Sequence, residues 1–292
     1  MIENLHILID NRPAPNQPDS LPFLTEHGLS IWFEKGGEQW LIDTGASDAF
    51  IRNALMAGIN TSQADYLVLS HNHNDHTGGV EWFLEINKKA QVYLSEWILK
   101  STCYSLKEGI PKNIGMDKEL LSQYADRFIR YPQKNTFITE GVALLSDIPS
   151  VHPLPAGNRT LAWQLYDHQE NEILPDPFHH EIAVLVLSDG GNTLISSCTH
   201  KGILNTLKAA VSFSGRPVAR FIGGLHLKDK AETKEELIHL AGIIEREYPE
   251  LQIYTGHCTS DSAYEILKQI IPKQIHLFHS GYKFGQFCQQ IM

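Results

Sequence analysis

Four potential metal ligands fall within six consecutive residues of this chain. The segment SHNHNDHTGG, residues 70–79, supplies His71, His73, Asp75 and His76 directly after the apolar run YLVL. A step of two residues at a strand end keeps the first two histidines on one side while the chain turns. Neutral imidazoles and a carboxylate suit zinc, iron or manganese, and burying so many ionisable groups without compensation would be costly. We therefore predict a metal site here, in preference to a polar loop with coincidental histidines.

Strands and helices must hold these residues in place, and their patterns recur along the chain. Strand-like runs cover residues 5–10, 29–34, 39–43, 66–70, 91–95, 142–147, 182–189, 193–198, 219–224 and 251–256. Apolar residues at helical spacing mark the segments 48–58, 201–212, 232–248 and 260–271. Early strands follow one another as hairpins, with a Gly-Gly turn in FEKGGEQ, while later strands alternate with helices. This mixture predicts the α/β class, as a four-layer αββα sandwich of two mixed β-sheets flanked by helices.

A single domain over residues 1–292 is predicted, because no internal repeat and no linker-like segment stands out. The Pro-rich stretch 11–22 is interpreted as a long loop after the first strand. Residues 100–140 have a weaker pattern, which predicts an inserted cap. We expect the substrate to lie between the metal site, this loop and the cap.

The charge and composition limit the expected partners. The chain carries 24 Lys and Arg against 34 Asp and Glu, which argues against a nucleic-acid partner and leaves open a local basic pocket. Residues 1–10 lack a signal-peptide pattern, and the longest aliphatic run, 182–187, is too short to span a bilayer. Without a CxxC motif, the cysteines suit a reducing compartment: they are Cys103, Cys198, Cys258 and Cys288. We expect a soluble, cytoplasmic protein with no membrane partner.

The histidine motif and its neighbours resemble those of the metallo-β-lactamase-fold hydrolases. The motif His-x-His-x-Asp-His follows an apolar strand, Gly78-Gly79 opens a helix, and Asp43-Thr44-Gly45 ends an earlier strand. Further segments extend the resemblance in order along nearly the whole chain: LIDN, EHGLSIWFE, LIDTGAS, SCTHKGILN, GGLHL and TGHCTS. Together they resemble the branch named for a dihydropterin-aminobenzene-phosphate synthase of methanopterin biosynthesis. Most members of that branch are metal-dependent hydrolases of unproved substrate, so the branch name does not define an activity.

The resemblance implies which residues bind metal. The first two histidines of the motif serve one metal, and the aspartate and third histidine serve a second, which here are His71, His73, Asp75 and His76. Four protein groups cannot fill two coordination shells, so further ligands are needed. His257, at the end of LQIYTG, matches the last histidine ligand of the superfamily. The alternative is a core histidine bonded to backbone.

Three more strand-end residues have a role implied by the resemblance. His200 stands where other branches often carry a bridging aspartate, with Cys198 as a softer candidate ligand or a buried packing residue. Asp43 resembles the aspartate that accepts a hydrogen bond from a ligand histidine and fixes its tautomer. Its competing role is as N-cap of the following helix, which Asp48 could fill instead.

Residues that could contact the substrate are less sharply indicated. His226, in GGLHL, suits hydrogen bonding to substrate or protonation of a leaving group better than metal binding. Lys112 and Lys201 are candidates to bind a phosphate or carboxylate, and the alternative for each is a solvated surface lysine. His180, with Glu181, stands where the branch usually carries an acidic pair, and the alternative is a solvated loop residue.

These residues predict a binuclear enzyme with two divalent metal ions, zinc first and iron or manganese as alternatives. Such a centre activates a water and polarises the scissile oxygen; Asp75 would orient the nucleophile and His226 would stabilise charge on the substrate oxygen. The predicted reaction is hydrolysis of a small ester, lactone or phosphodiester, with anionic substrates among the candidates. One alternative is the transferase chemistry of the branch's namesake, and another is a non-hydrolytic metal-binding or redox module. The sequence does not indicate an oligomeric state.

Overall fold

The structure is a computed structural model that describes residues 1–15, 22–107, 109–166 and 172–285 of the chain. Two compact units make up the chain. The first unit contains residues 1–133, 160–182 and 279–292, and the second contains residues 134–159 and 183–278. Each unit has its own main sheet and its own hydrophobic core. A single domain over the whole chain stays a prediction.

The main sheet of the first unit has the strand order β1-β2-β3-β4-β5-β8. Its strands are β1 (Asn4–Ile9), β2 (Ser30–Lys35), β3 (Glu38–Ile42), β4 (Tyr66–Val68), β5 (Gln91–Ser95) and β8 (Phe128–Tyr131). β1, β2 and β3 pair antiparallel, and the predicted Gly36-Gly37 turn joins β2 to β3 with φ of 61° and 80°, as a two-residue hairpin requires. β3, β4, β5 and β8 pair parallel. The residues that follow β3 and β4 therefore emerge at the same edge of this sheet.

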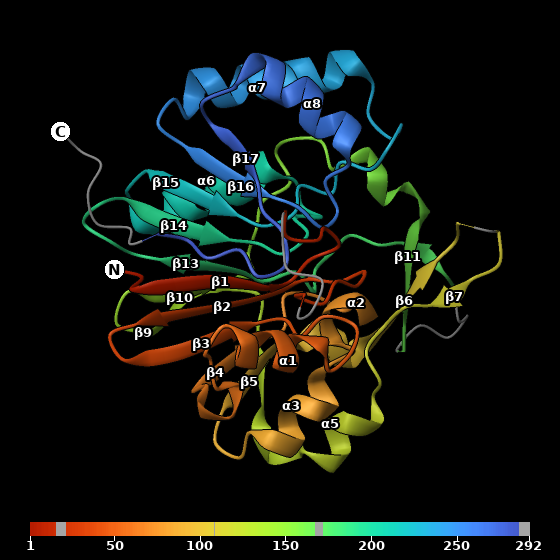
Figure 1. Cartoon of the computed structure of the whole chain (residues 1–292). Helices are drawn as coiled ribbons and strands as arrows, with labels where there is room; N and C mark the ends of the chain where they lie inside the picture. The colour runs from red at the N-terminus through yellow and green to blue at the C-terminus, as the bar shows by residue number, and fades with distance from the viewer. Residues whose placement is uncertain (16–21, 108, 167–171, 286–292) are drawn as a thin grey trace. The chain divides into compact units, whose positions relative to one another are not determined.

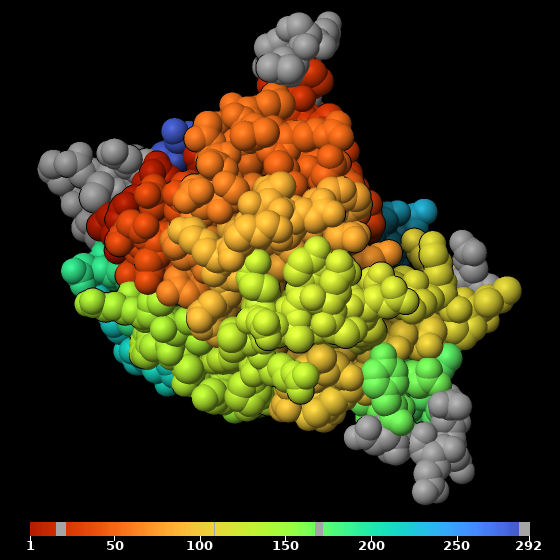
Figure 2. Space-filling view, turned by 90° about the horizontal axis from the view of Figure 1, so that it is seen from below, coloured from red at the N-terminus to blue at the C-terminus, as the bar shows by residue number. Residues whose placement is uncertain are grey.

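Short helices pack on the first sheet. They are α1 (Ala49–Met56), α2 (Asn74–Thr77), α3 (Val80–Ile86), α4 (Glu96–Lys100), α5 (Glu119–Gln123) and the 3-10 turns η1 (Thr61–Gln63) and η2 (Ala125–Arg127). Phe50 of α1 and Phe83 of α3 are fully buried in one cluster with Leu67 of β4. Burying an aromatic side chain of this kind contributes about 1.5–3 kcal/mol, so these contacts fix the helices on the sheet. Figure 1 shows α1 and α3 beside β3, β4 and β5, and Figure 2 shows the orange to yellow-green surface of these helices.

A small antiparallel sheet, β12-β11-β6-β7, also belongs to the first unit. Its strands are β6 (Ser101–Ser105), β7 (Lys112–Asn113), β11 (Leu161–Leu165) and β12 (Leu174–Pro175). In Figure 2 its yellow and green segments lie together at one side of the view. The predicted cap at 100–140 thus spans β6 and β7 of the small sheet, α5, and β8 of the main sheet, before it enters the second unit. Its role as a cap stays a prediction.

The main sheet of the second unit has the order β17-β16-β15-β14-β13-β10-β9. Its strands are β9 (Asn135–Thr139), β10 (Val142–Leu145), β13 (Ala183–Val186), β14 (Asn192–Ile195), β15 (Val218–Ile222), β16 (Gln252–Thr255) and β17 (Ile275–Leu277). β14, β15, β16 and β17 pair parallel. Residues that follow β14, β15 and β16 therefore gather at one edge, as the residues after β3 and β4 do in the first unit.

Three longer helices pack on the second sheet. They are α6 (Ile203–Ser214), α7 (Lys234–Glu247) and α8 (Asp261–Ile270), and the 3-10 turn η3 spans Ala156–Thr160. Leu207 of α6, Ala241 of α7 and Leu267 of α8 are fully buried in the cluster that contains Phe221. Ser260 is the N-cap of α8, since its side chain accepts a hydrogen bond from the N–H of Ala263. The α/β class predicted from the sequence is confirmed by these mixed sheets and helices.

Some predicted features lie outside the residues that the structure describes. Residues 16–21 of the Pro-rich loop and Cys288 lie outside the described residues. Among the helices that the structure describes, none has the length and apolar character to cross a membrane.

Candidate metal centre

Three histidines and two aspartates of the first unit form what we call the first cluster. It consists of Asp43, His71, His73, Asp75 and His76. Asp43 follows β3, and the other four residues follow β4 through the turn into α2. The ring centroid of His71 lies 4.5 Å from that of His73 and 4.2 Å from that of His76. Donor atoms of Asp43, His71 and His76 all lie within 4.8 Å of one another, so the predicted motif does converge in space.

Asp43 and Ser70 together set the tautomers of two histidines. The Ser70 hydroxyl donates to Asp43 Oδ2 at 2.6 Å, so at 2.8 Å it must accept a hydrogen bond from Nδ1 of His71. Nδ1 of His76 donates to Asp43 Oδ2 at 2.8 Å. Both rings therefore carry a hydrogen on Nδ1, and Nε2 of each ring is directed away from Asp43. This is the arrangement that a histidine bound to metal through Nε2 needs.

The environment keeps two of the histidines neutral. Burial lowers the pKa of His71 well below its ordinary value, and the neighbouring His76 and His73 lower it further. Burial also lowers the pKa of His73 to about 3. For His76, burial acts in the same direction, but the carboxylates of Asp75 and Asp43 outweigh it and raise the pKa to about 10. A divalent cation beside these carboxylates would take the place of that proton.

Asp75 is the member of the first cluster that reaches solvent. Its Oδ2 lies 3.5 Å from Nε2 of His76 and 3.4 Å from Nε2 of His27, and the side chain of Asp75 is 17% exposed. His27 is exposed, precedes β2 and was not predicted as a site residue. Asp75 is therefore placed where a carboxylate could both bind a metal and face a water.

The glycines of the motif allow close backbone packing. A Cβ on Gly79 would lie 2.5 Å from the carbonyl oxygens of Thr44 and Ser47, and one on Gly78 would lie 2.5 Å from that of Ala46. The N–H of Gly78 donates to the carbonyl of Gly45 at 3.0 Å. The segments LIDTGAS and HTGG, which carried the family resemblance, thus pack directly on each other.

The second unit has a separate group of candidate ligands, the second cluster. Cys198 and His200 follow β14, His226 follows β15, and His257 and Cys258 follow β16. Donor atoms of Cys198, His226 and Cys258 lie within 4.8 Å of one another. His226 and His257 have φ of 52° and 49°, a left-handed conformation that is costly away from glycine and that often marks functional positions. The parallel strands therefore bring together residues that are far apart in the sequence.

His200 has the same tautomer as His71 and His76. Its Nδ1 lies 2.9 Å from Oδ1 of Asn158, while Nδ2 of Asn158 donates to the carbonyl of His200 at 2.8 Å. The second bond fixes the amide orientation, so Nδ1 of His200 is the donor and Nε2 carries the lone pair. The ring of His226 packs at 4.0 Å from that of His200. Burial lowers the pKa of His226, and the thiol of Cys258 opposes this only in part, so His226 is neutral at pH 7.

Comparisons with known proteins bear on the fold. Residues 25–156 match the metallo-beta-lactamase superfamily. Among solved structures, the chain is similar to a metal-dependent hydrolase of the beta-lactamase superfamily, with a TM-score of 0.79, 23% identity and coverage of 97% of this chain and 98% of the other. The chain has the metallo-β-lactamase fold. The fold class and the family resemblance predicted from the sequence are therefore confirmed.

The chain is also similar to proteins with other names. The chain is 27% identical to the 7,8-dihydropterin-6-methyl-4-(beta-D-ribofuranosyl)-aminobenzene-5'-phosphate synthase of Methanocaldococcus jannaschii, over 89% of this chain and 90% of the other. Human tRNase Z, short form, has a TM-score of 0.50 and 11% identity, with coverage of 97% of this chain and 99% of the other. The superfamily match supports the prediction of an enzyme. Because the fold is shared with a protein named for tRNA, it does not support excluding nucleic acid.

The structure places the remaining predicted residues as follows. Lys112 is exposed in β7, as its solvated alternative expected. Lys201 is buried, 5% exposed, just before the Gly202 N-cap of α6, and His180 is fully buried. A solvated surface position is therefore wrong for these two residues. Asp48 is the N-cap of α1 but makes no capping bond through its side chain, which pairs with Arg52 instead.

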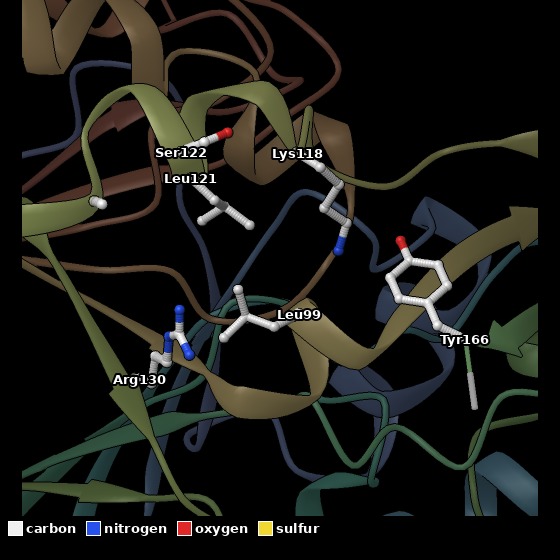
Figure 3. Close-up of a pocket in the computed structure, with 7 residues that line it drawn as sticks. Leu99, Lys118, Leu121, Ser122, Arg130 and Tyr166 are labelled. Atoms are coloured by element: carbon white, nitrogen blue, oxygen red, sulfur yellow. The ribbon is translucent and has the colours of Figure 1, made fainter.

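A pocket of about 550 Å³ lies in the region of the predicted cap (Figure 3). Its lining residues are Leu99, Lys118, Leu121, Ser122, Ala125, Arg130 and Tyr166. Nζ of Lys118 donates to the carbonyl oxygens of Ile98 and Ser101, at the end of α4, and burial lowers its pKa to about 8. This lysine is thus engaged in holding α4, and the lining residues that the structure describes include none of the candidate metal ligands.

Proposed function

We propose that this chain is a hydrolase that binds two divalent metal ions, with zinc as the expected metal. The proposed ligands are His71, His73, Asp75, His76, His200 and His257. The observation that carries the proposal is that His71, His76 and His200 each use Nδ1 for a hydrogen bond to a neighbouring oxygen, the arrangement in which a histidine binds metal through Nε2. Neutral imidazoles and a carboxylate fit zinc, iron or manganese.

The residues of the chain have distinct roles in the proposed reaction. Two bound divalent ions would supply a water of lowered pKa and polarise the oxygen of the scissile bond. Asp75, which is partly exposed, would hold the attacking water by accepting its hydrogen bond. His226, kept neutral by burial, would donate a ring N–H to the substrate oxygen as negative charge develops there. We propose a small ester, lactone or phosphodiester as the substrate class.

Loss of metal on substitution of a ligand tests the proposal. His73→Ala and Asp75→Ala should each lower the bound metal below two equivalents and reduce the hydrolysis of chromogenic esters, lactones and phosphodiesters, while the protein stays folded. The matched control is His239→Ala, at an exposed position of α7, which should keep both metals and full activity. Metal content is measured by elemental analysis after purification without chelator. Two metal equivalents retained in both ligand variants would refute the assignment.

A transferase is the second candidate function. It is favoured by the 27% identity, over most of both chains, to a protein named as a synthase that joins pterin and aminobenzene-phosphate groups. The same clusters would then hold metals for a condensation instead of a hydrolysis. Incubating the metal-loaded protein with an aminobenzene-ribofuranosyl phosphate and a dihydropterin whose 6-methylene carbon carries a diphosphate leaving group, beside the hydrolysis panel, separates the two. Product from the pterin mixture alone would favour the transferase over the hydrolase.

A further inference from the structure

A buried polar network surrounds the residue between the first two predicted metal ligands. Asn72 lies between His71 and His73, and its backbone N–H donates to Nδ1 of His180 at 3.1 Å. Nε2 of His180 lies 2.9 Å from Oδ2 of Asp176. His180 is 0% exposed and Asp176 is 5% exposed, so water does not compete for these bonds. All of these residues belong to the first unit.

The side chain of Asn72 is held as firmly as its backbone. Its Nδ2 donates to Sγ of Cys103, in β6, at 3.4 Å, and its Oδ1 accepts from the N–H of Met116 at 2.9 Å. The next turn is tied to the same segment, because the N–H of Asn74 donates to the carbonyl of Ile114 at 2.7 Å. The ligand turn is therefore anchored to the small sheet and to the segment that follows it.

The tautomer of His180 excludes two other roles for this network. Because Nδ1 accepts the N–H of Asn72, the ring hydrogen must be on Nε2. A metal on Nε2 would force that hydrogen onto Nδ1, against the N–H of Asn72. In a nucleophilic triad the carboxylate and the thiol would face different ring nitrogens, but Cys103 Sγ, at 3.5 Å, shares Nε2 with Asp176. The fully buried Cys103 also offers no path to a substrate.

We propose that His180 and Asp176 are positioning residues for the metal site, which act through the peptide N–H of Asn72. Asp176 fixes the ring of His180 through Nε2, and Nδ1 of His180 fixes the peptide between the two ligands. The rings of His71 and His73 pack beside the ring of His180, at centroid distances of 6.2 Å and 5.9 Å. This inference rests on the proposed function, since it requires His71 and His73 to bind metal. It also gives the small sheet a role, because Cys103 and Asn72 join that sheet to the ligand turn.

Two substitutions of the same residue separate this role from general packing. In His180→Asn the amide oxygen can take the place of Nδ1 and still accept the N–H of Asn72. In His180→Gln the longer amide reaches the place of Nε2, keeps Asp176 as a partner, and lacks the acceptor for Asn72. We expect His180→Gln to weaken Zn²⁺ binding by roughly 10- to 100-fold, the usual cost of losing a group that orients a metal ligand, and His180→Asn to stay within about threefold of the parent.

Zn²⁺ affinity is measured by chelator competition on the metal-free full-length chain, with the visible spectrum of bound Co²⁺ as a second reading of ligand geometry. Equal affinities for His180→Gln and the parent would overturn the inference, and so would equal losses in the Gln and Asn variants. If His180→Gln does not fold, Asp176→Asn serves in its place. Its Zn²⁺ affinity should fall by roughly tenfold, and an affinity equal to that of the parent would overturn the inference.

His71→Ala distinguishes failure of the proposed ligand set from failure of the positioning role. If it keeps full affinity, the proposed ligand set fails; if it loses metal while His180→Gln does not, only the positioning role fails.

Discussion

At the scale of single residues, the ligand types could be predicted from the sequence and, apart from Asp43, their supporting partners could not. The motif at 71–76 has a spacing that metal chemistry uses, and the hydrogen bond from His76 to Asp43 has the form that the resemblance implied for Asp43. Ser70 and Asn158 gave no such signal, and His180 was predicted only as a candidate substrate contact or a solvated loop residue. Their roles depend on hydrogen bonds between residues distant in sequence. The bond between Asn158 and His200, for example, joins residues 42 positions apart. Sequence patterns describe periodicity along the chain and carry no information on such pairs.

Ser70 offers the sharpest residue-scale prediction. Ser70→Ala removes the group that accepts from Nδ1 of His71 and donates to Asp43, so the tautomer of His71 is no longer fixed. Zn²⁺ affinity should fall roughly 10- to 100-fold, measured by chelator competition. The control is Thr233→Ala, which removes the N-cap of α7 and should cost about 1 kcal/mol of stability with no change in affinity. Unchanged Zn²⁺ binding in Ser70→Ala would show that this hydroxyl does not orient a ligand.

At the scale of elements, the long periodic helices were predictable, and the shortest helices and the polar strand β6 were not. α6, α7 and α8 each have at least 10 residues and match predicted segments, whereas α4 and α5 have 5 residues each and were not predicted. Five residues make too few turns for a 3.6-residue period to stand out. β6 was missed because its sequence, STCYS, is polar and it pairs with β11, which is distant in the chain. Such strands are stabilised by tertiary pairing more than by intrinsic preference.

Two glycine substitutions test the packing of elements in opposite directions. In Gly79→Ala, the new Cβ would meet backbone oxygens at 2.5 Å, so α3 must move away from the segment after β3. The free energy of unfolding should fall by about 1–3 kcal/mol, and metal affinity should fall as well. In Gly242→Ala, within α7, the new Cβ meets nothing within 4 Å, and stability should rise by about 0.5–1 kcal/mol. Urea unfolding measures both, and a Gly79→Ala variant as stable as the parent would contradict the close approach.

At the scale of the whole molecule, composition and element order predicted the α/β class, but not the division of the chain. Residues 134–159 and 160–182 are neighbours in sequence and belong to different units. No change of composition marks position 160, because both segments are strand-rich and contribute to sheets. The compact units are defined by which strands pair, and strand pairing is a property of tertiary structure. For the same reason the net charge of -10 describes the average charge of the surface and not the charge of any one site.

The stability of the whole molecule should depend on pH through His6, a buried residue of β1 whose ring packs edge-on against Trp32. Burial, and then the charge of Lys283, lower the pKa of His6 from 6.5 to about 4. Between pH 6.5 and pH 4 the unfolded chain binds a proton at His6 that the folded chain excludes. The free energy of unfolding therefore has its full value, as far as His6 is concerned, above pH 6.5 and falls as the pH is lowered toward 4. At pH 5 the free energy of unfolding is lower by about 2 kcal/mol, since each pKa unit corresponds to 1.36 kcal/mol.

His6→Phe keeps an aromatic ring without a titrating group, so its free energy of unfolding should fall less between pH 7 and pH 5 than that of the parent. Parallel urea titrations of the two proteins at both pH values measure the difference, and equal losses would show that His6 is not the group responsible.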